Sequence, residues 1–324
     1  MMRAQLEAVI DELKTLRAEG VSSVYLEEQT IADLKAKAGT VEAVAPSTAP
    51  APVAKVSTLP SPPENQPNLL ASWKSESDVP EKPKAATKPA VKKDANIPDW
   101  IKPIPAPTAF DIPEGDKQTQ WNWLRDKIFN DPICREHVRL EKGKKVVFGV
   151  GNLDADVFFC GEAPGADEEI QGEPFVGKAG QLLDKIIAAT GLKRDLVMIG
   201  NIMNWRPEHD KPYGNRPPTE TEIAYCLPHL EAQVEIVKPK VIVALGATAA
   251  HGLLGYDPER TVGRTRGKWM EFKGIPLILT YHPSYLLRNN TNRSKRMVWE
   301  DMLLVMDKIG LEISEKQRGY FAEK

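Results

Sequence analysis

Short apolar runs recur along the last two thirds of the chain, from about residue 118 onwards. They cover residues 146–150, 157–160, 196–199, 241–245 and 277–280. Each run is continuous rather than alternating, which is typical of strands that are buried on both faces of a sheet. Between them, apolar residues follow helical spacing over residues 179–190, 220–237, 247–254 and 294–309. This order of strands and helices predicts an α/β fold, with a parallel sheet between two layers of helices.

The first 115 residues follow a different pattern and predict two further regions. Residues 1–40 carry apolar side chains at helical spacing, which predicts a short N-terminal amphipathic helical segment. Because forty residues bury little surface, we interpret it as a helical hairpin or as a helix that binds a protein partner. Residues 41–115 hold more than half of the 27 prolines and are rich in Ala and Lys, which predicts a disordered linker. The main folded domain is expected over residues 116–324.

Composition narrows the class of protein. The sequence contains no apolar run that approaches the roughly 18 residues needed to span a membrane, and its N-terminus lacks the apolar core of a signal peptide. Three cysteines without paired spacing fit a reducing compartment, so we expect a cytoplasmic protein without a membrane partner. The net charge of −2 excludes little. Basic side chains nevertheless gather in the last third, where a local phosphate-binding face is expected.

The segment over residues 161–180, GEAPGADEEIQGEPFVGKAG, directly follows one of the apolar runs. Its glycines allow sharp turns of the backbone, and its carboxylates are more numerous than a simple surface turn needs. They include Glu162, Asp167, Glu168 and Glu169, and a carboxylate in such a loop can hold water. Phe175 lies just before another glycine and offers a ring on which a flat molecule could stack. The segment therefore has the features of an active-site loop.

Polar side chains also follow two other predicted strands. Asn201 follows the run over 196–199, and His282 follows the run over 277–280. Taken singly, each has an ordinary structural explanation, Asn201 as a turn former and His282 as a cap. Because the carboxyl ends of parallel strands meet at one edge of a sheet, the three segments together predict a single cleft.

This set of side chains suits the excision of a base. An Asn amide can read the N3–H and O4 edge of uracil and mismatches cytosine, while a phenyl ring stacks on the pyrimidine. A His donor near O2 would stabilise the charge that develops as the glycosidic bond breaks, and a carboxylate would position water. The sequence has no Walker lysine, metal triad or HExxH motif, which argues against phosphoryl transfer.

Long motifs in order complete this interpretation. They are VVFGVGN, GEAPGADEEIQGEPFVGKAGQLLDKI, GNIMNWRP, KPKVIVALG, LTYHPSYLLR and KRMVWEDM. Over roughly residues 134–309 the chain resembles the uracil-DNA glycosylase superfamily, in particular its family 4. The resemblance implies a three-layer α/β/α sandwich with a central, mostly parallel four-stranded sheet. It also implies an enzyme that acts on DNA containing uracil and hydrolyses the N-glycosidic bond of a flipped-out uracil, leaving an abasic site. We expect a monomer, because the domain has no evident reason to dimerise.

The resemblance assigns roles to single residues. Glu162 and Glu168 are the candidates for handling water, with the choice between them open, and His282 stabilises the departing uracil anion. Phe175 stacks on uracil and Asn201 reads its edge. The remaining nucleotide contacts are expected from the backbone of Pro164 and Gly165.

A second expected function concerns the loop over residues 282–288. A glycosylase must extrude its base, and an apolar wedge in the duplex offsets part of the unstacking cost. Tyr285 and Leu286 resemble that wedge, although packing at a helix start explains them equally well. Ser284 and Arg288 are expected to contact the phosphates nearby.

One departure from family 4 concerns its [4Fe–4S] cluster, which four cysteines hold. The matching positions here carry Cys134, His137, Trp205 and Cys226. An indole cannot ligate iron, and cluster sites normally need four ligands. We therefore expect that the cluster has been lost, that Trp205 packs in its place, and that the chemistry needs no cofactor.

Other functions stay open at this stage. The chain could be a glycosylase for another deaminated base, since Asn201 does not define a whole pocket. It could also be a non-catalytic DNA-binding protein that retains the fold. Four candidate side chains argue against this, namely Glu162, Phe175, Asn201 and His282. The cross-linking branch of the superfamily is disfavoured, because residues 208–218 include His209 but lack that branch's motif.

Overall fold

The computed structural model describes residues 103–138, 140–207 and 215–322. The predictions for residues 1–40 and for most of the segment 41–115 lie outside the described residues. Among the described residues, no helix is both long and apolar enough to cross a membrane.

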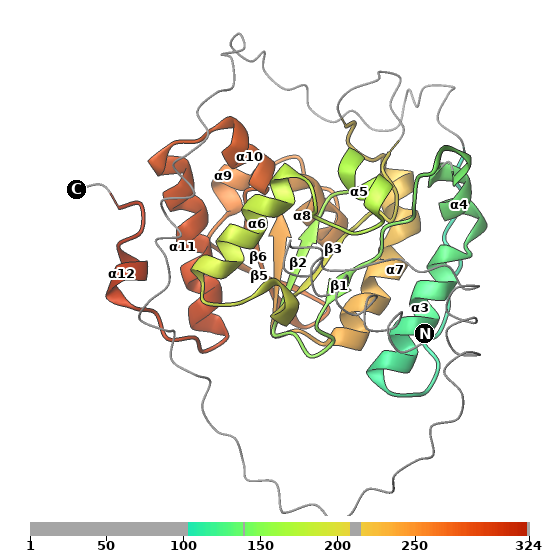
Figure 1. Cartoon of the computed structure of the whole chain (residues 1–324), viewed down its shortest axis with the longest axis horizontal. Coiled ribbons are helices and arrows are strands. Elements are labelled where there is room, and N and C mark those ends of the chain that lie inside the picture. Colours follow the sequence, from blue (N-terminus) through green and yellow to red (C-terminus); the bar gives the residue numbers. More distant parts are fainter. Residues whose placement is uncertain (1–102, 139, 208–214, 323–324) are drawn as a thin grey trace, which may run out of the picture. The chain divides into compact units, whose positions relative to one another are not determined.

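A mixed sheet lies at the centre of the described chain (Figure 1). Its strand order is β1-β3-β2-β4-β6-β5. The four inner strands are mutually parallel and comprise β3 (Met198–Asn201), β2 (Val157–Gly161), β4 (Val241–Leu245) and β6 (Ile275–Thr280). The two outer strands, β1 (Val150–Gly151) and β5 (Trp269–Phe272), pair antiparallel with β3 and β6. The prediction of a four-stranded sheet therefore describes the parallel centre. Of the edges, β1 overlaps the apolar run over 146–150 at one residue, and β5 was not predicted.

Both edge strands have weak patterns. Only Val150 of the predicted strand over 146–150 lies in β1, although residues 146–149 are buried. Gly151 has a φ of +134°, and a side chain there would collide with the backbone of Val197, the residue before β3. The β5 strand alternates exposed and less exposed side chains, so it lacks the continuous apolar run that marks a central strand.

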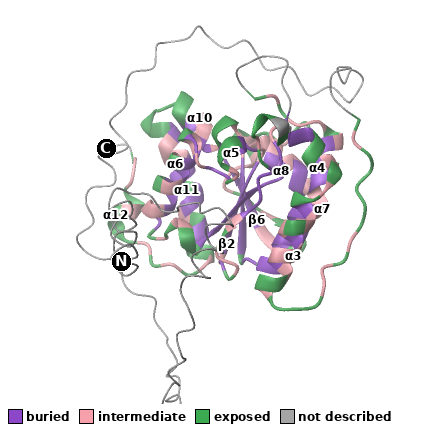
Figure 2. Cartoon of the chain, turned by 45° about the vertical axis from the view of Figure 1, so that its right-hand side comes forward, coloured by how far each residue is buried: buried purple, intermediate pink, exposed green. Residues whose placement is uncertain are grey.

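Helices cover both faces of the sheet and make the expected three layers (Figures 1 and 2). One layer contains α3 (Lys117–Phe129), α4 (Pro132–Val138), α7 (Glu220–Val237) and α8 (Ala247–Leu254). The other contains α6 (Lys178–Ala189), α10 (Pro283–Arg288) and α11 (Asn292–Lys308). The short elements are η1 (Leu140–Lys142), α5 (Ala166–Gln171), η2 (Arg194–Leu196), α9 (Val262–Thr265) and α12 (Glu315–Arg318).

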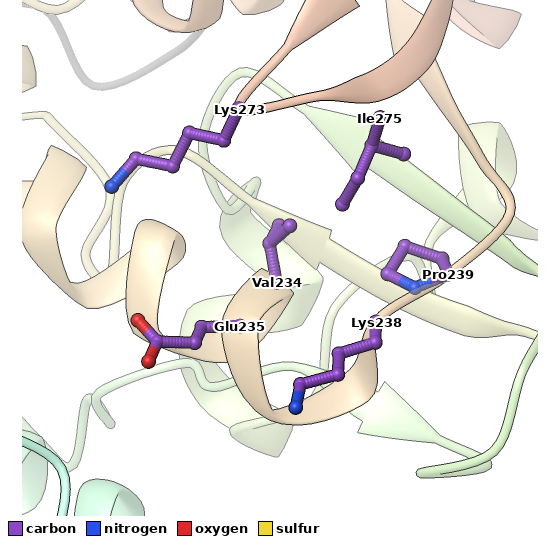
Figure 3. Close-up of a pocket in the computed structure, with 6 residues that line it drawn as sticks. All are labelled: Val234, Glu235, Lys238, Pro239, Lys273 and Ile275. Carbon is purple, nitrogen blue, oxygen red and sulfur yellow. The ribbon is translucent and has the colours of Figure 1, made fainter.

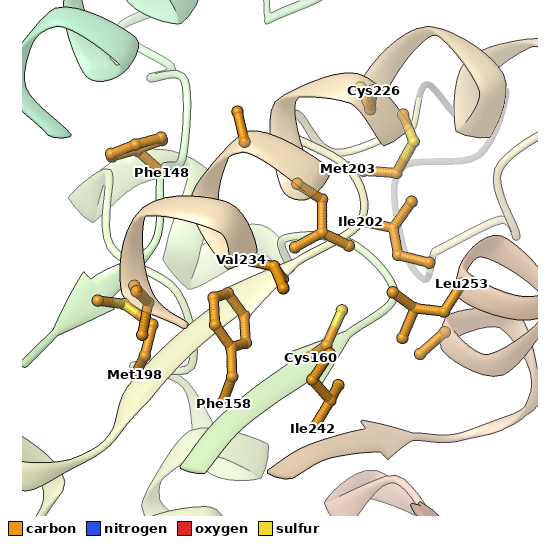
Figure 4. Close-up of a cluster of buried hydrophobic side chains, with 14 of the residues drawn as sticks. Phe148, Phe158, Cys160, Met198, Ile202, Met203, Cys226, Val234, Ile242 and Leu253 are labelled. Carbon is orange, nitrogen blue, oxygen red and sulfur yellow. The ribbon is translucent and has the colours of Figure 1, made fainter. Parts of the chain in front are cut away.

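Alternation along each inner strand supplies two hydrophobic cores. On β2, Phe158 and Cys160 pack into the core beneath α7, whereas Val157 and Phe159 pack into the core beneath α6 and α11. Figure 4 shows the α7 side, where Phe158 and Cys160 lie with Ile242 of β4 among the buried side chains. Because both faces are covered, the inner strands are continuously apolar, as the sequence predicted.

Candidate active site

The carboxyl ends of β2 and β3 lie side by side. Gly161 of β2 pairs with Asn201 of β3 in the parallel register. A Cβ at position 161 would lie 2.6 Å from Cζ of Phe175 and closer still to the Asn201 amide oxygen. The glycine is therefore required for space, because it lets the ring and the amide approach the end of β2.

Phe175 forms one wall of the site. Its backbone has a φ of +55°, which a non-glycine residue adopts only where its surroundings impose it. The ring is buried and lies 5.6 Å from the ring of His282, with 31° between the two planes. The structure thus brings together two residues that are more than one hundred positions apart in the sequence.

Asn201 carries an unusual buried atom. Its side chain is buried at the end of β3, and within the described chain its Oδ1 has no hydrogen-bond partner. A buried amide oxygen without a donor costs free energy, and such atoms in folded proteins mark sites where a ligand or water supplies the missing donor. Asn201 is thus positioned to accept a hydrogen bond from a bound molecule.

His282 has a defined hydrogen-bonding role. It is the N-cap of α10, where Nδ1 accepts the backbone N–H of Ser284 at 3.1 Å and lies 2.9 Å from the Ser284 hydroxyl. Burial lowers the pKa of His282 to about 4, and the charge of Arg288 contributes in the same direction. A neutral ring whose Nδ1 accepts a hydrogen bond must carry its proton on Nε2. His282 can therefore act as a neutral donor near pH 7.

A buried acid anchors the strand that leads to His282. The Thr280 hydroxyl donates to Asp301 of α11 at 2.6 Å, and Arg266 forms an ion pair with the same carboxylate at 3.0 Å. Burial raises the pKa of Asp301 to about 6, although Thr280 and Arg266 act in the opposite direction. Asp301 lies within the motif KRMVWEDM, and none of the residues of this motif was predicted to belong to the site.

The two candidate water-handling carboxylates occupy different environments. Glu162 directly follows β2 and is partly exposed, while its carbonyl accepts the backbone N–H of Met203. Glu168 is buried in α5. Its Oε2 accepts the backbone N–H of Gly165 at 3.0 Å and its Oε1 accepts that of Gly177 at 3.1 Å. Pro164 is buried and Gly165 is the N-cap of α5, so both belong to the same turn.

The expected wedge needs one correction. Tyr285 stacks on Tyr281 with ring centroids 4.2 Å apart, and Arg288 is exposed. Leu286 is only 2% exposed and packs in the core with α6 and α11, so it cannot enter a DNA duplex without leaving that core. Leu287, which the sequence analysis passed over, is 44% exposed. Two adjacent leucines carry no sequence pattern that tells which one faces inward.

Comparison with known proteins now identifies the family. A model of the uracil DNA glycosylase superfamily matches residues 148–303. A type-4 uracil-DNA glycosylase of Thermotoga maritima is 43% identical over 158 residues, which are 48% of this chain and 79% of that protein. The chain belongs to the uracil-DNA glycosylase superfamily.

Two further members of this superfamily agree with the first. A type-4 uracil-DNA glycosylase of Archaeoglobus fulgidus is 43% identical over 169 residues, covering 50% of this chain and 82% of that protein. One of Pyrobaculum aerophilum is 37% identical over 178 residues, covering 53% of this chain and 87% of that protein. The superfamily match spans the strand ends that carry Glu162, Asn201 and His282.

Family 4 members of the superfamily hold an iron–sulfur cluster, and the residues at its four positions here do not fit one. Trp205 is fully buried, and His137 stacks on it with ring centroids 5.2 Å apart and 24° between the planes. Cys134 and Cys226 are buried in the same core. Over residues 103–138, 140–207 and 215–322, no group of three or more His, Cys, Asp or Glu side chains could hold a metal ion.

The two remaining thiols have the character of core residues. Burial raises the pKa of Cys134 and of Cys226 well above the usual range for a thiol. Figure 4 shows Cys226 beside Met203, among apolar side chains. At these four positions an aromatic pair and two buried thiols thus pack into the core.

A separate cavity lies away from the candidate site residues. It has a volume of about 300 Å³ and is lined by Val234, Glu235, Lys238, Pro239, Lys273 and Ile275 (Figure 3). These residues precede β4 and begin β6, so the cavity lies at the amino ends of the parallel strands. In open parallel α/β sheets, ligands bind at the opposite edge, where the carboxyl ends of the strands lie. None of the candidate site residues lines this cavity.

Proposed function

We propose that this protein is a uracil-DNA glycosylase that hydrolyses the N-glycosidic bond of a uracil flipped out of DNA and leaves an abasic site. The observation that carries the proposal is the Oδ1 of buried Asn201, which has no partner among the described residues and lies close to the ring of Phe175 at Gly161. Uracil supplies the missing donor, since its N3–H points along the edge that an amide can read.

Recognition follows from the two ends of the Asn201 amide. Its Oδ1 accepts the uracil N3–H, and its Nδ2 donates to O4. Cytosine presents an acceptor at N3 and a donor at N4, so it leaves both groups of the buried amide unpaired. Rejection based on unpaired buried polar groups is stronger than rejection based on size. Phe175 contributes by stacking on the face of the pyrimidine.

Bond cleavage then uses His282 and Glu162. As the bond between C1′ and N1 breaks, uracil takes the electron pair and leaves as an anion. The low pKa of His282 keeps its ring neutral near pH 7. The neutral ring donates a hydrogen bond from Nε2 to O2 of that anion and keeps its proton, because a neutral imidazole is a very weak acid. Glu162 holds the water that attacks C1′, accepts its proton and offsets the positive charge on the sugar.

The DNA contacts centre on α10. We assign the wedge to the exposed Leu287 together with Tyr285, because a side chain must reach outward to enter the base stack. Arg288 and the backbone around Ser284 then contact the phosphates that flank the extruded nucleotide. Pro164 and Gly165 contact the same strand from the loop after β2.

We propose that this glycosylase works without an iron–sulfur cluster. The buried Trp205 and its stacked neighbour His137 support this, because together they fill space that a cluster would need. Iron analysis of anaerobically purified protein tests the proposal, and stoichiometric iron with a visible absorbance band would overturn it. We further propose that the protein is a cytoplasmic monomer. Its residues 1–40 bind a protein partner, and the linker over residues 41–115 tethers this segment to the catalytic domain.

The proposed activity is tested with oligonucleotides that carry uracil, hypoxanthine or no lesion. Wild type should produce alkali-labile sites only at uracil. Asn201→Ala should reduce the rate by about 100-fold or more, and His282→Ala by a similar factor, since each removes a group that acts on the base. Asn130→Ala is the matched control, because it removes an exposed amide at the end of α3. Wild type without uracil-dependent cleavage, or with cleavage at hypoxanthine instead, contradicts the proposal.

A further inference from the structure

Glu168 joins two loops that are separate in the sequence. Its Oε2 accepts the backbone N–H of Gly165 at 3.0 Å, three residues upstream. Its Oε1 accepts the backbone N–H of Gly177 at 3.1 Å, nine residues downstream. The carboxylate is 9% exposed. One buried side chain thus connects the turn after Glu162 with the turn after Phe175.

The two amides are the N-caps of two helices. Gly165 is the N-cap of α5 and Gly177 is the N-cap of α6. N–H groups at a helix start lack an intrahelical acceptor, and the helix dipole favours a negative charge at that end. A carboxylate is therefore the suitable side chain for this position. Hydrogen bonds to a charged acceptor are also stronger than those between neutral groups.

Both glycines lie close to carboxylate oxygens. A Cβ on Gly165 would lie 2.5 Å from Oε2 of Glu168. A Cβ on Gly177 would lie 2.7 Å from a carboxylate oxygen of Asp167 and 3.4 Å from Oε1 of Glu168. The spacing of glycines around the loop thus matches the close approach of this carboxylate to the backbone.

The connection determines where Phe175 lies. Phe175 is two residues before Gly177 and has the φ of +55° that its surroundings must impose. Its ring lies against Gly161 and His282 at the base site. A hydrogen bond that holds Gly177 therefore holds the backbone of the stacking residue. The bond to Gly165 holds the turn that leaves Glu162.

We propose that Glu168 is a positioning residue, which fixes the stacking wall and the water-handling loop relative to each other, and that Glu162 is the carboxylate that acts on water. This inference rests on the proposed uracil-DNA glycosylase function. Each oxygen of Glu168 already accepts a main-chain hydrogen bond, whereas Glu162 follows the end of β2 and is more exposed.

The hydrogen bonds themselves are tested without an activity assay. In wild-type protein labelled with ¹⁵N-glycine, the amides of Gly165 and Gly177 should both be protected from hydrogen exchange. In Glu168→Gln an NH₂ group must face one of the two amides, so at least one should exchange about tenfold to a hundredfold faster. Asp167→Asn is the control, because Asp167 is exposed in the same helical turn. Unprotected amides in the wild type, or unchanged exchange in Glu168→Gln, would overturn the proposal.

Kinetics separates positioning from action on water. Glu168→Gln should weaken inhibition by free uracil about tenfold, because the stacking wall moves, yet keep the acid limb of the pH–rate profile. Glu162→Gln should lose that limb and leave inhibition by uracil unchanged. The opposite pattern would make Glu168 the group that acts on water. If Glu168→Gln is poorly folded, Glu168→Asp, which keeps the charge but cannot span both amides, replaces it. Absence of cleavage by wild type refutes the proposed function, whereas active wild type with a reversed pattern refutes only this inference.

Discussion

The replacement of Trp205 by alanine most directly tests what this residue contributes at one of the four positions that correspond to the cluster ligands of family 4. Trp205 is fully buried in the loop after β3, where it contacts the ring of His137 and lies 6.2 Å from the ring of Tyr225. If these rings support the loop in place of a metal, their loss should reduce stability while leaving the chemical groups of the base site intact.

The size of the effect follows from burial. A tryptophan removes up to roughly 250 Å² from water, which at about 25 cal/mol per Å² corresponds to about 6 kcal/mol. Its Nε1 is buried without a hydrogen-bond partner among the described residues, which offsets roughly 1–3 kcal/mol. The net cost of Trp205→Ala should therefore be about 3–5 kcal/mol, as for other buried aromatic side chains. For a domain of this size the melting temperature falls by on the order of 10 °C.

Urea denaturation measures this free energy of unfolding. Trp269→Ala provides the matched control, because Trp269 on the edge strand β5 is 38% exposed and contacts the Lys308 ammonium at 5.6 Å. Its removal should cost no more than about 1–2 kcal/mol. Cleavage by folded Trp205→Ala at low temperature should stay within about tenfold of the wild-type rate, since Trp205 is not among the groups assigned to the base.

Equal costs for the two tryptophans would refute the reasoning, because burial would then not explain the role of Trp205. Iron bound to the wild type and released by Trp205→Ala would refute it in a different way, since the position would then still serve a cluster.

Three more predictions concern the site and the core. Leu287→Ala should reduce cleavage of duplex substrate more than cleavage of single-stranded substrate, and it should leave stability unchanged. Leu286→Ala should instead cost about 2–5 kcal/mol of stability. The reverse pattern would restore Leu286 as the wedge. Gly161→Ala should lower cleavage by about 100-fold with a stability cost of only about 1–3 kcal/mol, because the new methyl group displaces the ring of Phe175, and activity near wild type would contradict that geometry. Burial lowers the pKa of His229 to about 4. The stability that its neutral ring confers is therefore complete above pH 6.5 and falls by up to roughly 3 kcal/mol towards pH 4. His229→Gln should reduce this loss when unfolding is followed against pH.

The sequence by itself determined the centre of this fold and predicted side chains that the structure brings together at one edge of the sheet. The four inner strands were predictable because burial on both faces demands continuous apolar runs. Asn201 and His282 were predictable because each directly follows such a run, and parallel strands end at one edge. Trp205 was recognisable as a poor ligand because that depends on chemical type and needs no coordinates.

Tertiary structure alone decided which similar residues differ in role. Leu286 and Leu287 are chemically identical, and only the packing of α10 against α6 directs one inward and the other outward. Glu162 and Glu168 are likewise the same residue type, and their difference depends on Gly177, whose amide reaches Glu168 only once the loop has folded back. A local sequence pattern shows which residues are apolar. Which atoms of a polar side chain form hydrogen bonds depends on partners that are distant in the sequence.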